Sequence, residues 1–181
     1  QVVDLQGPTI TCPANINNRA ANPNQCYATG INLGNPVVTD NCGTVASVTN
    51  NAPAQFPVGT TTVTWTATDN SGNTATCNQT VRVVDTQSPM IVCPASLVNV
   101  PADAGQCYAT GVALGTPFTF DNCGVASLTN NAPAQFPLGT TTVTWTVTDV
   151  TGFMATCVQT VQVVDTQVPS ITCPPHLTNV P

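Results

Sequence analysis

The carboxylates of this chain recur at fixed positions and could bind a metal ion. All eight acidic residues are Asp, and only Asp103 stands outside a repeat of 80 or 81 residues. The repeated positions are Asp4, Asp85 and Asp165, then Asp40 and Asp121, and finally Asp69 and Asp149. Three carboxylates with Asn and backbone oxygens could supply the roughly six to eight oxygen ligands that Ca²⁺ takes. The alternative is that Asp and Asn stand here because they favour turns.

Cysteines offer the second kind of chemistry. The chain has nine cysteines, and Cys12, Cys26, Cys42 and Cys77 return 80 or 81 residues later as Cys93, Cys107, Cys123 and Cys157. This density indicates disulfides and an oxidising compartment, which places the protein outside the cell or on its surface. No C-x-x-C pair occurs, which argues against a zinc site and against a thioredoxin-like redox site.

Four cysteines in one repeat allow three connectivities. Of these we expect Cys12–Cys26 and Cys42–Cys77 in the first repeat, with Cys93–Cys107 and Cys123–Cys157 in the second. The second bond of each repeat would tie its middle to its last strand. We expect the partner of Cys173 to lie outside this chain, and an intermolecular bond is the alternative.

Composition and residue types argue against catalysis and against polyanion binding. His176 is the only His, so neither repeat contains a base for Ser–His or Cys–His chemistry. The net charge is −6, with Arg19 and Arg82 as the only Lys or Arg residues, which excludes the basic clusters that nucleic acids need. No apolar run approaches a membrane span, and no signal peptide begins the sequence. We therefore predict a protein that is not an enzyme.

The residues that could do chemistry must be positioned by a duplicated stretch, Phe56–Cys77 and Phe136–Cys157. Apolar and Thr residues alternate strictly in its first half, which predicts a strand with one buried face. The inward positions of the first copy are Val63, Trp65 and Ala67. A five-residue loop at 69–73 and a second run at 74–84 complete a predicted β-hairpin.

The repeats define the predicted domains. Residues 1–4 match the end of each later repeat and are interpreted as the last strand of a preceding one; repeat one covers 5–85, repeat two covers 86–165, and a third starts over 166–181. Each repeat shows about seven short strand patterns and no helical pattern, which predicts an all-β protein of tandem antiparallel β-sandwiches stapled by disulfides. Short links that contain proline favour an extended rod.

This architecture predicts that the Asp residues gather in threes. The loop at Asp69 should lie at the pole where the preceding link enters with Asp4, and a Cys42–Cys77 bond would hold Asp40 there. The expected calcium sites are Asp4, Asp40 and Asp69 in repeat one and Asp85, Asp121 and Asp149 in repeat two. We expect Ca²⁺ less at the second site, because two polar residues of its loop are lost.

The motifs together resemble the hyalin repeat (HYR) family. They are Cys-Pro, Asp-Asn-Cys-Gly, Phe-Pro-x-Gly-Thr-Thr-x-Val-Thr, Thr-Asp-x-x-Gly, Ala-Thr-Cys and Val-Val-Asp-x-x-x-Pro, and both repeats carry all of them. The resemblance implies an extracellular immunoglobulin-like β-sandwich in tandem arrays linked to cell adhesion and matrix assembly, with no catalytic residues. Repeat two departs from the pattern at the hairpin loop, where Asn70 and Asn73 are replaced by Val150 and Phe153.

Two further features could involve the protein surface. Asn78-Gln79-Thr80 is an N-glycosylation sequon on the outward face beside Cys77. Repeat two also carries large apolar residues near one pole, namely Phe118, Phe120, Val150, Phe153 and Met154, and of these only Phe118 replaces a residue that is already apolar, Val37. These residues would either enlarge the local core or form an exposed patch for a neighbouring repeat or another chain.

We therefore expect a structural protein, a rod or filament of tandem domains that serves a surface fibre, a matrix or adhesion. The expected partners are neighbouring repeats or copies of the chain, and cell-surface or matrix proteins or glycans. No cofactor is required, with Ca²⁺ expected only where repeats join. The alternative function is a glycan- or protein-binding accessory module of a larger surface protein.

Overall fold

The computed structural model describes residues 3–173, and every regular element in this range is a strand. The eight strands of the first repeat are β1 (Thr9–Thr11), β2 (Ile16–Ala20), β3 (Tyr27–Ala28), β4 (Val37–Thr39), β5 (Val45–Asn50), β6 (Phe56–Pro57), β7 (Gly59–Asp69) and β8 (Thr74–Val84). The second repeat follows the same order with β9 (Met90–Val92), β10 (Leu97–Pro101), β11 (Tyr108–Thr110), β12 (Phe118–Phe120), β13 (Val125–Asn130), β14 (Gln135–Pro137), β15 (Gly139–Asp149) and β16 (Met154–Val164). The all-β fold that the sequence predicts is confirmed.

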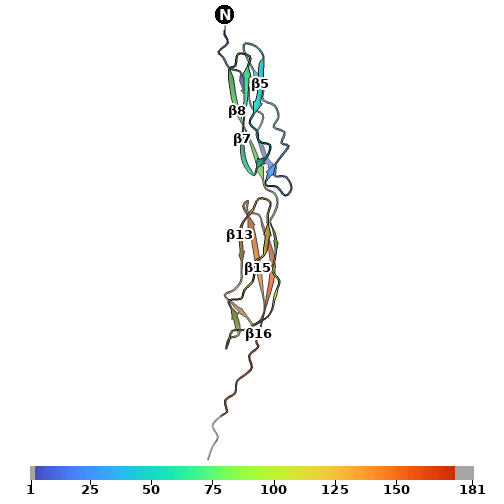
Figure 1. Cartoon of the computed structure of the whole chain (residues 1–181), viewed down its shortest axis with the longest axis vertical. Coiled ribbons are helices and arrows are strands. Elements are labelled where there is room, and N and C mark those ends of the chain that lie inside the picture. The colour runs from blue at the N-terminus through green and yellow to red at the C-terminus, as the bar shows by residue number, and fades with distance from the viewer. Residues whose placement is uncertain (1–2, 174–181) are drawn as a thin grey trace, which may run out of the picture. The chain divides into compact units, whose positions relative to one another are not determined.

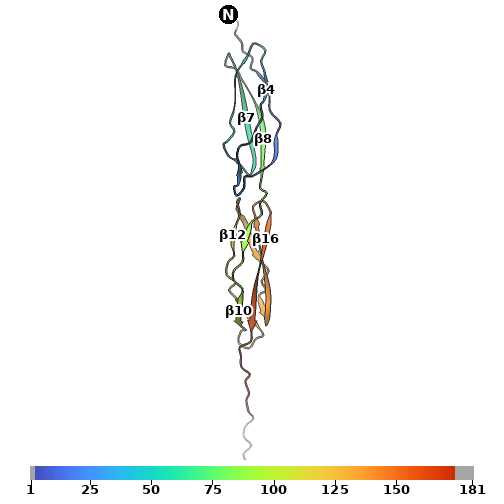
Figure 2. The ribbon, with the colours of Figure 1, turned by 90° about the vertical axis from the view of Figure 1, so that its right-hand side faces the viewer.

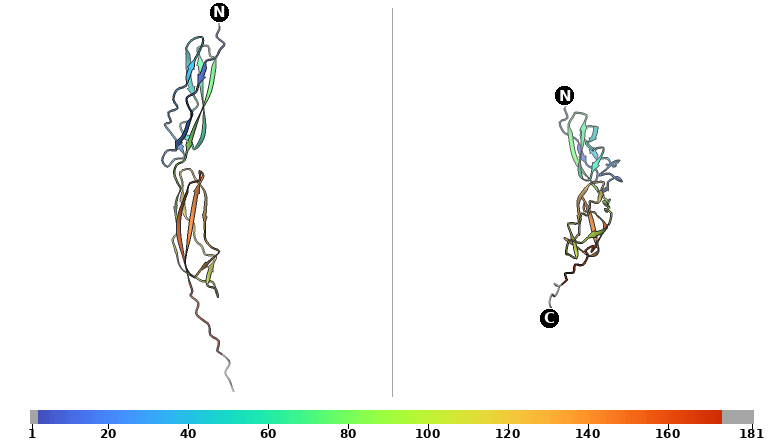
Figure 3. Two further views of the ribbon diagram at one scale, coloured as in Figure 1. Left: turned by 180° about the vertical axis from the view of Figure 1, so that it is seen from behind. Right: turned by 60° about the horizontal axis from the view of Figure 1, so that its bottom comes forward.

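Each repeat contains one four-stranded sheet and two short strand pairs. The sheets have the orders β2-β8-β7-β5 and β10-β16-β15-β13, and Figure 1 shows the long strands of each lying side by side. The short pairs are β1-β4 and β3-β6 in the first repeat, and β9-β12 and β11-β14 in the second. Figure 2 labels β4 and β12 in a view turned by 90°, and the left view of Figure 3 shows the ribbon from behind.

The hairpin β7–β8 consists of two strands of 11 residues each, and its sequence explains this length. Gly59 to Thr68 pair in unbroken antiparallel register with Val83 to Thr74, so the alternation of apolar and Thr residues places one face inward throughout. Asp69 ends β7, and Gly72 in the loop has a φ of 89°, which a glycine adopts without strain. The predicted hairpin and its inward face are confirmed, because Val63, Trp65 and Ala67 are all buried.

The core of each repeat lies between its four-stranded sheet and the short pairs. In the first repeat it joins Val63, Trp65, Val81 and Val83 of the long hairpin to Ala28 and Phe56 of β3 and β6. The second repeat uses the equivalent residues Ala109, Phe136, Val143, Trp145, Val161 and Val163. This arrangement is a β-sandwich with a small apolar core, as expected for a repeat of this length.

A fully buried glutamine crosses each core. The Trp65 indole N–H donates to Gln79 Oε1 at 3.1 Å, and the Gln79 amide donates to the carbonyls of Ala14 and Leu33. Gln159 makes the same bonds with Trp145, Ala95 and Leu114. Because every polar group in this network has a partner, its burial is tolerated and it fixes two loops against the sheet.

One pairing in each four-stranded sheet is parallel, although the sequence predicts antiparallel sandwiches. β2 runs parallel to β8 and β10 runs parallel to β16, each with a register shift in the middle. Asn18 and Asn99 lie within these shifts and have φ values of 57° and 56°. Asn tolerates this left-handed conformation better than most residues. It therefore allows β2 and β10 to form a bulge and then continue their pairing.

These parallel pairs correct the disulfides expected within each repeat. Ile16 pairs with Val81, so the residues four positions earlier, Cys12 and Cys77, meet and form a disulfide. The equivalent register in the second repeat joins Cys93 to Cys157. The expected bonds Cys12–Cys26, Cys42–Cys77, Cys93–Cys107 and Cys123–Cys157 are therefore wrong. The prediction tied the middle of each repeat to its last strand, whereas the fold brings the first part of each repeat against that strand.

The chain divides into two compact units whose limits differ from those of the repeats. Of the described residues, the first unit contains 3–89 together with 120–126 and 149–153, and the second contains 90–119, 127–148 and 154–173. Two segments of the second repeat thus belong to the first unit. The expected terminal repeats lie partly outside the described residues, namely at 1–2 and at 174–181, which include His176. Their described parts, 3–4 and 166–173, form no strand.

Candidate functional site

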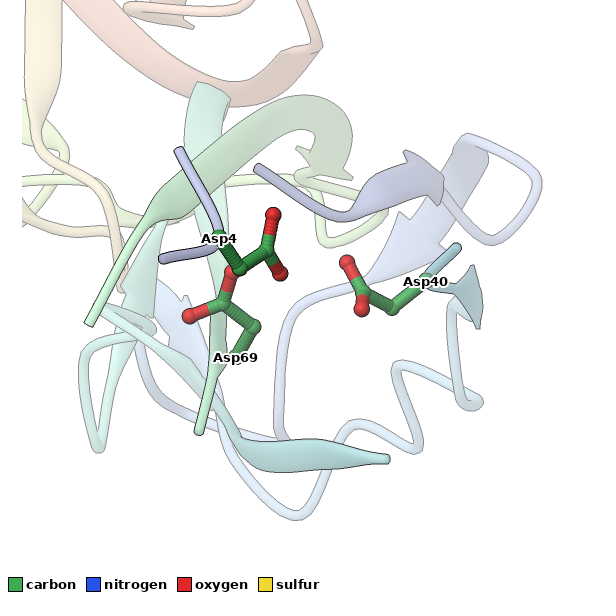
Figure 4. A group of neighbouring side chains, drawn as sticks. All are labelled: Asp4, Asp40 and Asp69. Carbon is green, nitrogen blue, oxygen red and sulfur yellow. The ribbon is translucent and has the colours of Figure 1, made fainter. Parts of the chain in front are cut away.

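The first predicted Asp triad is brought together in the first unit. Asp4 precedes β1, Asp40 directly follows β4, and Asp69 ends β7. One carboxylate oxygen from each lies within 4.8 Å of the other two, and Figure 4 shows the Asp40 carboxylate directed toward those of Asp4 and Asp69. The expected reason for the position of Asp40 was wrong, because Cys42 does not bond to Cys77. The pairing of β1 with β4 places Asp40 instead.

Asp69 is already satisfied by the hairpin loop. Its Oδ1 accepts backbone N–H bonds from Ser71 and Asn73 at 2.8 Å each, and its Oδ2 accepts the Asn73 side-chain amide at 2.8 Å. Burial raises the pKa of Asp69, but the bonds from Asn73, Ser71 and Gly72 outweigh it and the net pKa is lowered. The same Asn73 amide donates to the carbonyl of Asp4, which holds the entering chain against the loop.

The second predicted triad, Asp85, Asp121 and Asp149, also lies entirely within the first unit. Asp85 follows β8, Asp121 follows β12 and Asp149 ends β15, and their carboxylate oxygens lie within 4.8 Å of one another. Asp85 and Asp149 are 6% and 2% exposed. This cluster is therefore more buried than the first one.

Each carboxylate of the second triad uses one oxygen and leaves the other without a partner. Asp121 Oδ1 accepts the backbone N–H groups of Cys123 and Gly124, at 2.7 and 2.9 Å. Asp149 Oδ1 accepts bonds from the backbone and hydroxyl of Thr151 and from the Phe153 N–H. Asp85 Oδ1 accepts the Gln87 N–H. The three Oδ2 atoms are buried and have no hydrogen-bond partner.

The hydrogen bonds of the Asp149 loop also set its ionisation. Burial raises the pKa of Asp149, but the bonds from Thr151, Phe153 and Gly152 outweigh this effect and the net pKa is lowered. Asp149 is therefore a carboxylate at neutral pH.

Asn122 joins this site although the sequence analysis did not select it. Its amide N–H₂ donates to the Gln25 carbonyl at 3.0 Å and to Asp85 Oδ1 at 3.3 Å, and its Oδ1 is buried without a partner. The only sequence signal was that Asn precedes Cys in both copies of Asp-Asn-Cys-Gly. That signal did not distinguish Asn122 from Asn41, which is exposed in the first repeat.

A disulfide beside the second triad joins the two repeats. Cys26, which precedes β3, bonds to Cys123 across 97 residues of sequence, with the two Cα atoms 4.7 Å apart. Both cysteines belong to the first unit. This bond was not predicted, because every expected pair lay within one repeat.

The remaining cysteines of the described chain, Cys42, Cys107 and Cys173, are exposed thiols. Cys42 is the counterpart of Cys123, and Cys107 is the counterpart of Cys26. The negative charge of Asp4 raises the pKa of the Cys42 thiol most, followed by burial and the charge of Asp40. A raised pKa leaves less of the reactive thiolate at neutral pH.

The other selected residues lie on the surface. Asn78 of the sequon is exposed and accepts a hydrogen bond from the Thr64 hydroxyl. The apolar residues gained by the second repeat are also exposed rather than buried in a larger core: Phe118, Phe120, Val150, Phe153 and Met154. Asp103 and Asp165 belong to neither triad; they accept hydrogen bonds from Thr110 and Gln167.

Comparison with known proteins identifies the family. The HYR domain matches residues 3–83 and again 84–163, so the chain belongs to the HYR domain family. The chain is 36% identical over 184 aligned residues to hyalin of Strongylocentrotus purpuratus, an alignment that covers 95% of this chain and 15% of that protein. It is 39% identical to hyalin of Lytechinus variegatus, with 76% of this chain and 28% of that protein covered. The chain therefore spans a minor part of these relatives.

Another relative combines many kinds of domain. The chain is 31% identical to rat sushi, von Willebrand factor type A, EGF and pentraxin domain-containing protein 1, over 85% of this chain and 4% of that protein. Among solved structures, human mucin-like protocadherin EC1-2 covers 87% of this chain at 14% identity and a TM-score of 0.46. The described residues contain no helix that is long and apolar enough to span a bilayer.

Proposed function

We propose that this chain is a non-catalytic structural segment of an extracellular protein, in which tandem HYR repeats build a fibre, a matrix or an adhesion stalk. The observation that carries the proposal is the Cys26–Cys123 disulfide, which bonds one family-matched segment to the next. A covalent bond between consecutive repeats suits a protein that must resist pulling or proteolysis rather than one that must turn over substrate. Three disulfides also favour a location outside the cell.

The cysteine counterparts extend this proposal to neighbouring repeats. Cys107 stands where Cys26 stands, and Cys42 stands where Cys123 stands, and both are exposed thiols. Each offers the same bond to the matching loop of another HYR repeat. Formation of such a bond releases two protons and two electrons, which a disulfide of the oxidising compartment, such as oxidised glutathione, accepts.

The exposed apolar residues of the second repeat support a contact with another chain or repeat as part of the same function. Phe118 and Met154 are 61% and 64% exposed, which favours an interaction surface over a larger core. Replacing Phe120 with Thr, the residue at the equivalent position 39, should weaken assembly and leave folding unchanged. Unchanged assembly of this variant would remove these residues from the proposal.

The accessible sequon supports a glycosylated surface. Asn78 is exposed on the outer face of β8, and the second repeat has Val158 at the equivalent position, so a glycan there is compatible with the fold but not required by it. Mass spectrometry of the secreted protein before and after glycosidase treatment tests this. A peptide that carries unmodified Asn78 in full yield would contradict it.

Electron microscopy of native material tests the proposed function. Filaments with beads of domain size support a structural fibre. Dispersed short particles bound to a cell-surface glycan or protein would instead support an accessory binding module, and would overturn the fibre. Reduction of the disulfides should shorten or loosen the filaments if the bonds between repeats maintain them.

A further inference from the structure

We propose that Asp85, Asp121 and Asp149, together with Asn122, form a Ca²⁺ site, and that the equivalent first-repeat cluster binds the ion far more weakly. This inference goes beyond the structural function and does not depend on filament formation. It rests on the hydrogen-bond partners of individual oxygens rather than on the acidic residues alone.

The second cluster holds buried carboxylate oxygens that no hydrogen bond in the described structure satisfies. The Oδ2 atoms of Asp85, Asp121 and Asp149 are buried without a hydrogen-bond partner. Buried carboxylate oxygens are normally paired, because the loss of solvation is costly otherwise. One oxygen from each residue also lies within 4.8 Å of the others, so the three charges repel one another. A bound cation offsets both costs.

The elements of the available ligand atoms indicate which cation the site would prefer. All the unpartnered atoms of the site are oxygens: three from carboxylates and one, Asn122 Oδ1, from an amide. Hard oxygen ligands favour Ca²⁺, Mg²⁺ or Mn²⁺ over zinc and copper, which prefer nitrogen and sulfur. Ca²⁺ accepts irregular sets of ligands, whereas Mg²⁺ demands near-octahedral geometry and retains its water. Four oxygens from three different loops fit Ca²⁺ best.

The ligand oxygens are fixed before any ion binds. Two backbone N–H groups hold Asp121 Oδ1, and three donors hold Asp149 Oδ1. The Gln25 carbonyl and Asp85 Oδ1 accept the Asn122 amide, which determines its orientation. The Cys26–Cys123 disulfide adjoins both Gln25 and Asn122. Binding therefore requires little ordering of side chains, which favours affinity.

The first cluster differs at one decisive position. Asn73 donates its side-chain amide to Asp69 Oδ2 and so occupies the oxygen that a cation would use. Phe153 takes the place of Asn73 in the second repeat and has no such donor, which leaves Asp149 Oδ2 free. Of the first triad's carboxylate oxygens, only Asp40 Oδ2 is buried without a partner. The loss of Asn in the second loop thus favours the cation, the opposite of the expectation from sequence.

Isothermal titration of the whole chain with CaCl₂, after removal of metals with EGTA and in the presence of Mg²⁺, tests the inference. We expect one Ca²⁺ per chain. Asp149→Asn should abolish the binding heat, while the matched first-repeat variant Asp69→Asn should retain it. Equal binding by wild type and Asp149→Asn would overturn the site, and so would loss of binding in Asp69→Asn alone.

A second variant addresses the role of position 153 without removing a ligand. Phe153→Asn restores the donor of the first repeat at an exposed position, so folding should be preserved and circular dichroism can verify it. We expect its dissociation constant for Ca²⁺ to rise on the order of 10-fold, the usual effect of an altered outer hydrogen bond. An unchanged constant would contradict the argument from Asn73. No Ca²⁺ heat and no thermal shift in the wild-type chain would overturn the whole proposal, whatever the native assembly looks like.

Discussion

Single side chains decide how the two loops differ in chemistry. Asn73 satisfies Asp69 in the first repeat, whereas Phe153 leaves Asp149 with an unpartnered oxygen. The backbone bonds to the other oxygen are the same in both loops, from residues two and four positions further along. The turn is therefore maintained by Asp alone, and the residue at its end determines whether the carboxylate is available to a ligand.

The ionisation of Asp69 should make the free energy of unfolding depend on pH. Its lowered pKa means that the folded state favours the ionised form, so this contribution is present above the ordinary Asp pKa of 3.8 and is lost as pH falls below it. Wild type should therefore lose its advantage over Asp69→Asn as pH is lowered from neutral through that range, in buffer with EGTA. Urea unfolding at a series of pH values measures this. A constant difference between the two proteins would contradict it.

The buried glutamine should matter more than any surface polar residue. Gln159→Leu removes the partner of the Trp145 indole and of the carbonyls of Ala95 and Leu114. We expect unfolding free energy to fall by about 2–4 kcal/mol, because buried polar groups lose their partners. Gln162→Ala on the same strand is exposed and should change stability by less than about 0.5 kcal/mol. Denaturant unfolding followed by Trp fluorescence compares them, and equal effects would contradict the role of Gln159.

At the scale of elements, local patterns were predictable and distant pairings were not. The β7–β8 hairpin follows from alternation and a loop signal within a few residues of sequence. The parallel pairing of β2 with β8 joins the two ends of a repeat, and no local signal specifies it. The disulfide Cys12–Cys77 depends on that pairing. The prediction that the cysteines form disulfides was therefore possible from sequence, whereas the predicted partners were wrong.

The Cys12–Cys77 bond should be a major source of stability. The replacement Cys12→Ala with Cys77→Ala opens a loop closed across 65 residues of sequence. The chain-entropy model gives a loss of about 4 kcal/mol in unfolding free energy. Thermal and denaturant unfolding of the double variant measure the loss. The matched control, Cys107→Ser, changes an exposed free thiol and should leave stability unchanged; a comparable loss in both would contradict this account.

The candidate site was predictable in its residues but not in its details. The repeat-fixed positions of the Asp residues and the expected meeting of loop and link at one pole indicated both triads, and the structure brings both together. The proposed order of Ca²⁺ affinity for the two triads depends on which carboxylate oxygen accepts which hydrogen bond, and no sequence pattern indicates this. Residue polarity alone suggested that Asn73 would assist a cation, whereas its amide donates a hydrogen bond to Asp69 Oδ2.

For the molecule as a whole, the disulfide between repeats and the calcium site should stabilise each other. Cys123 follows two proposed ligands, Asp121 and Asn122, and its bond to Cys26 holds them near Asp85. Cys26→Ser should therefore weaken Ca²⁺ binding, and by linkage Ca²⁺ should slow reduction of this bond. Titration calorimetry and timed alkylation during reduction measure the two effects. Cys107→Ser, at the equivalent unbonded position, should change neither.

The bond between repeats is the central claim, and non-reducing peptide mapping tests it most directly. The secreted chain is alkylated to block free thiols, cleaved at Asp residues without reduction, and analysed by mass spectrometry. Cys12 and Cys26 lie on one peptide, because no Asp separates them. We predict that this peptide is linked to the peptides of Cys77 and Cys123, and that a second species links Cys93 to Cys157. A peptide that carries Cys12 and Cys26 with no linked partner, together with a peptide of Cys123 linked to that of Cys157, would contradict it, because every cysteine pair would then lie within one repeat.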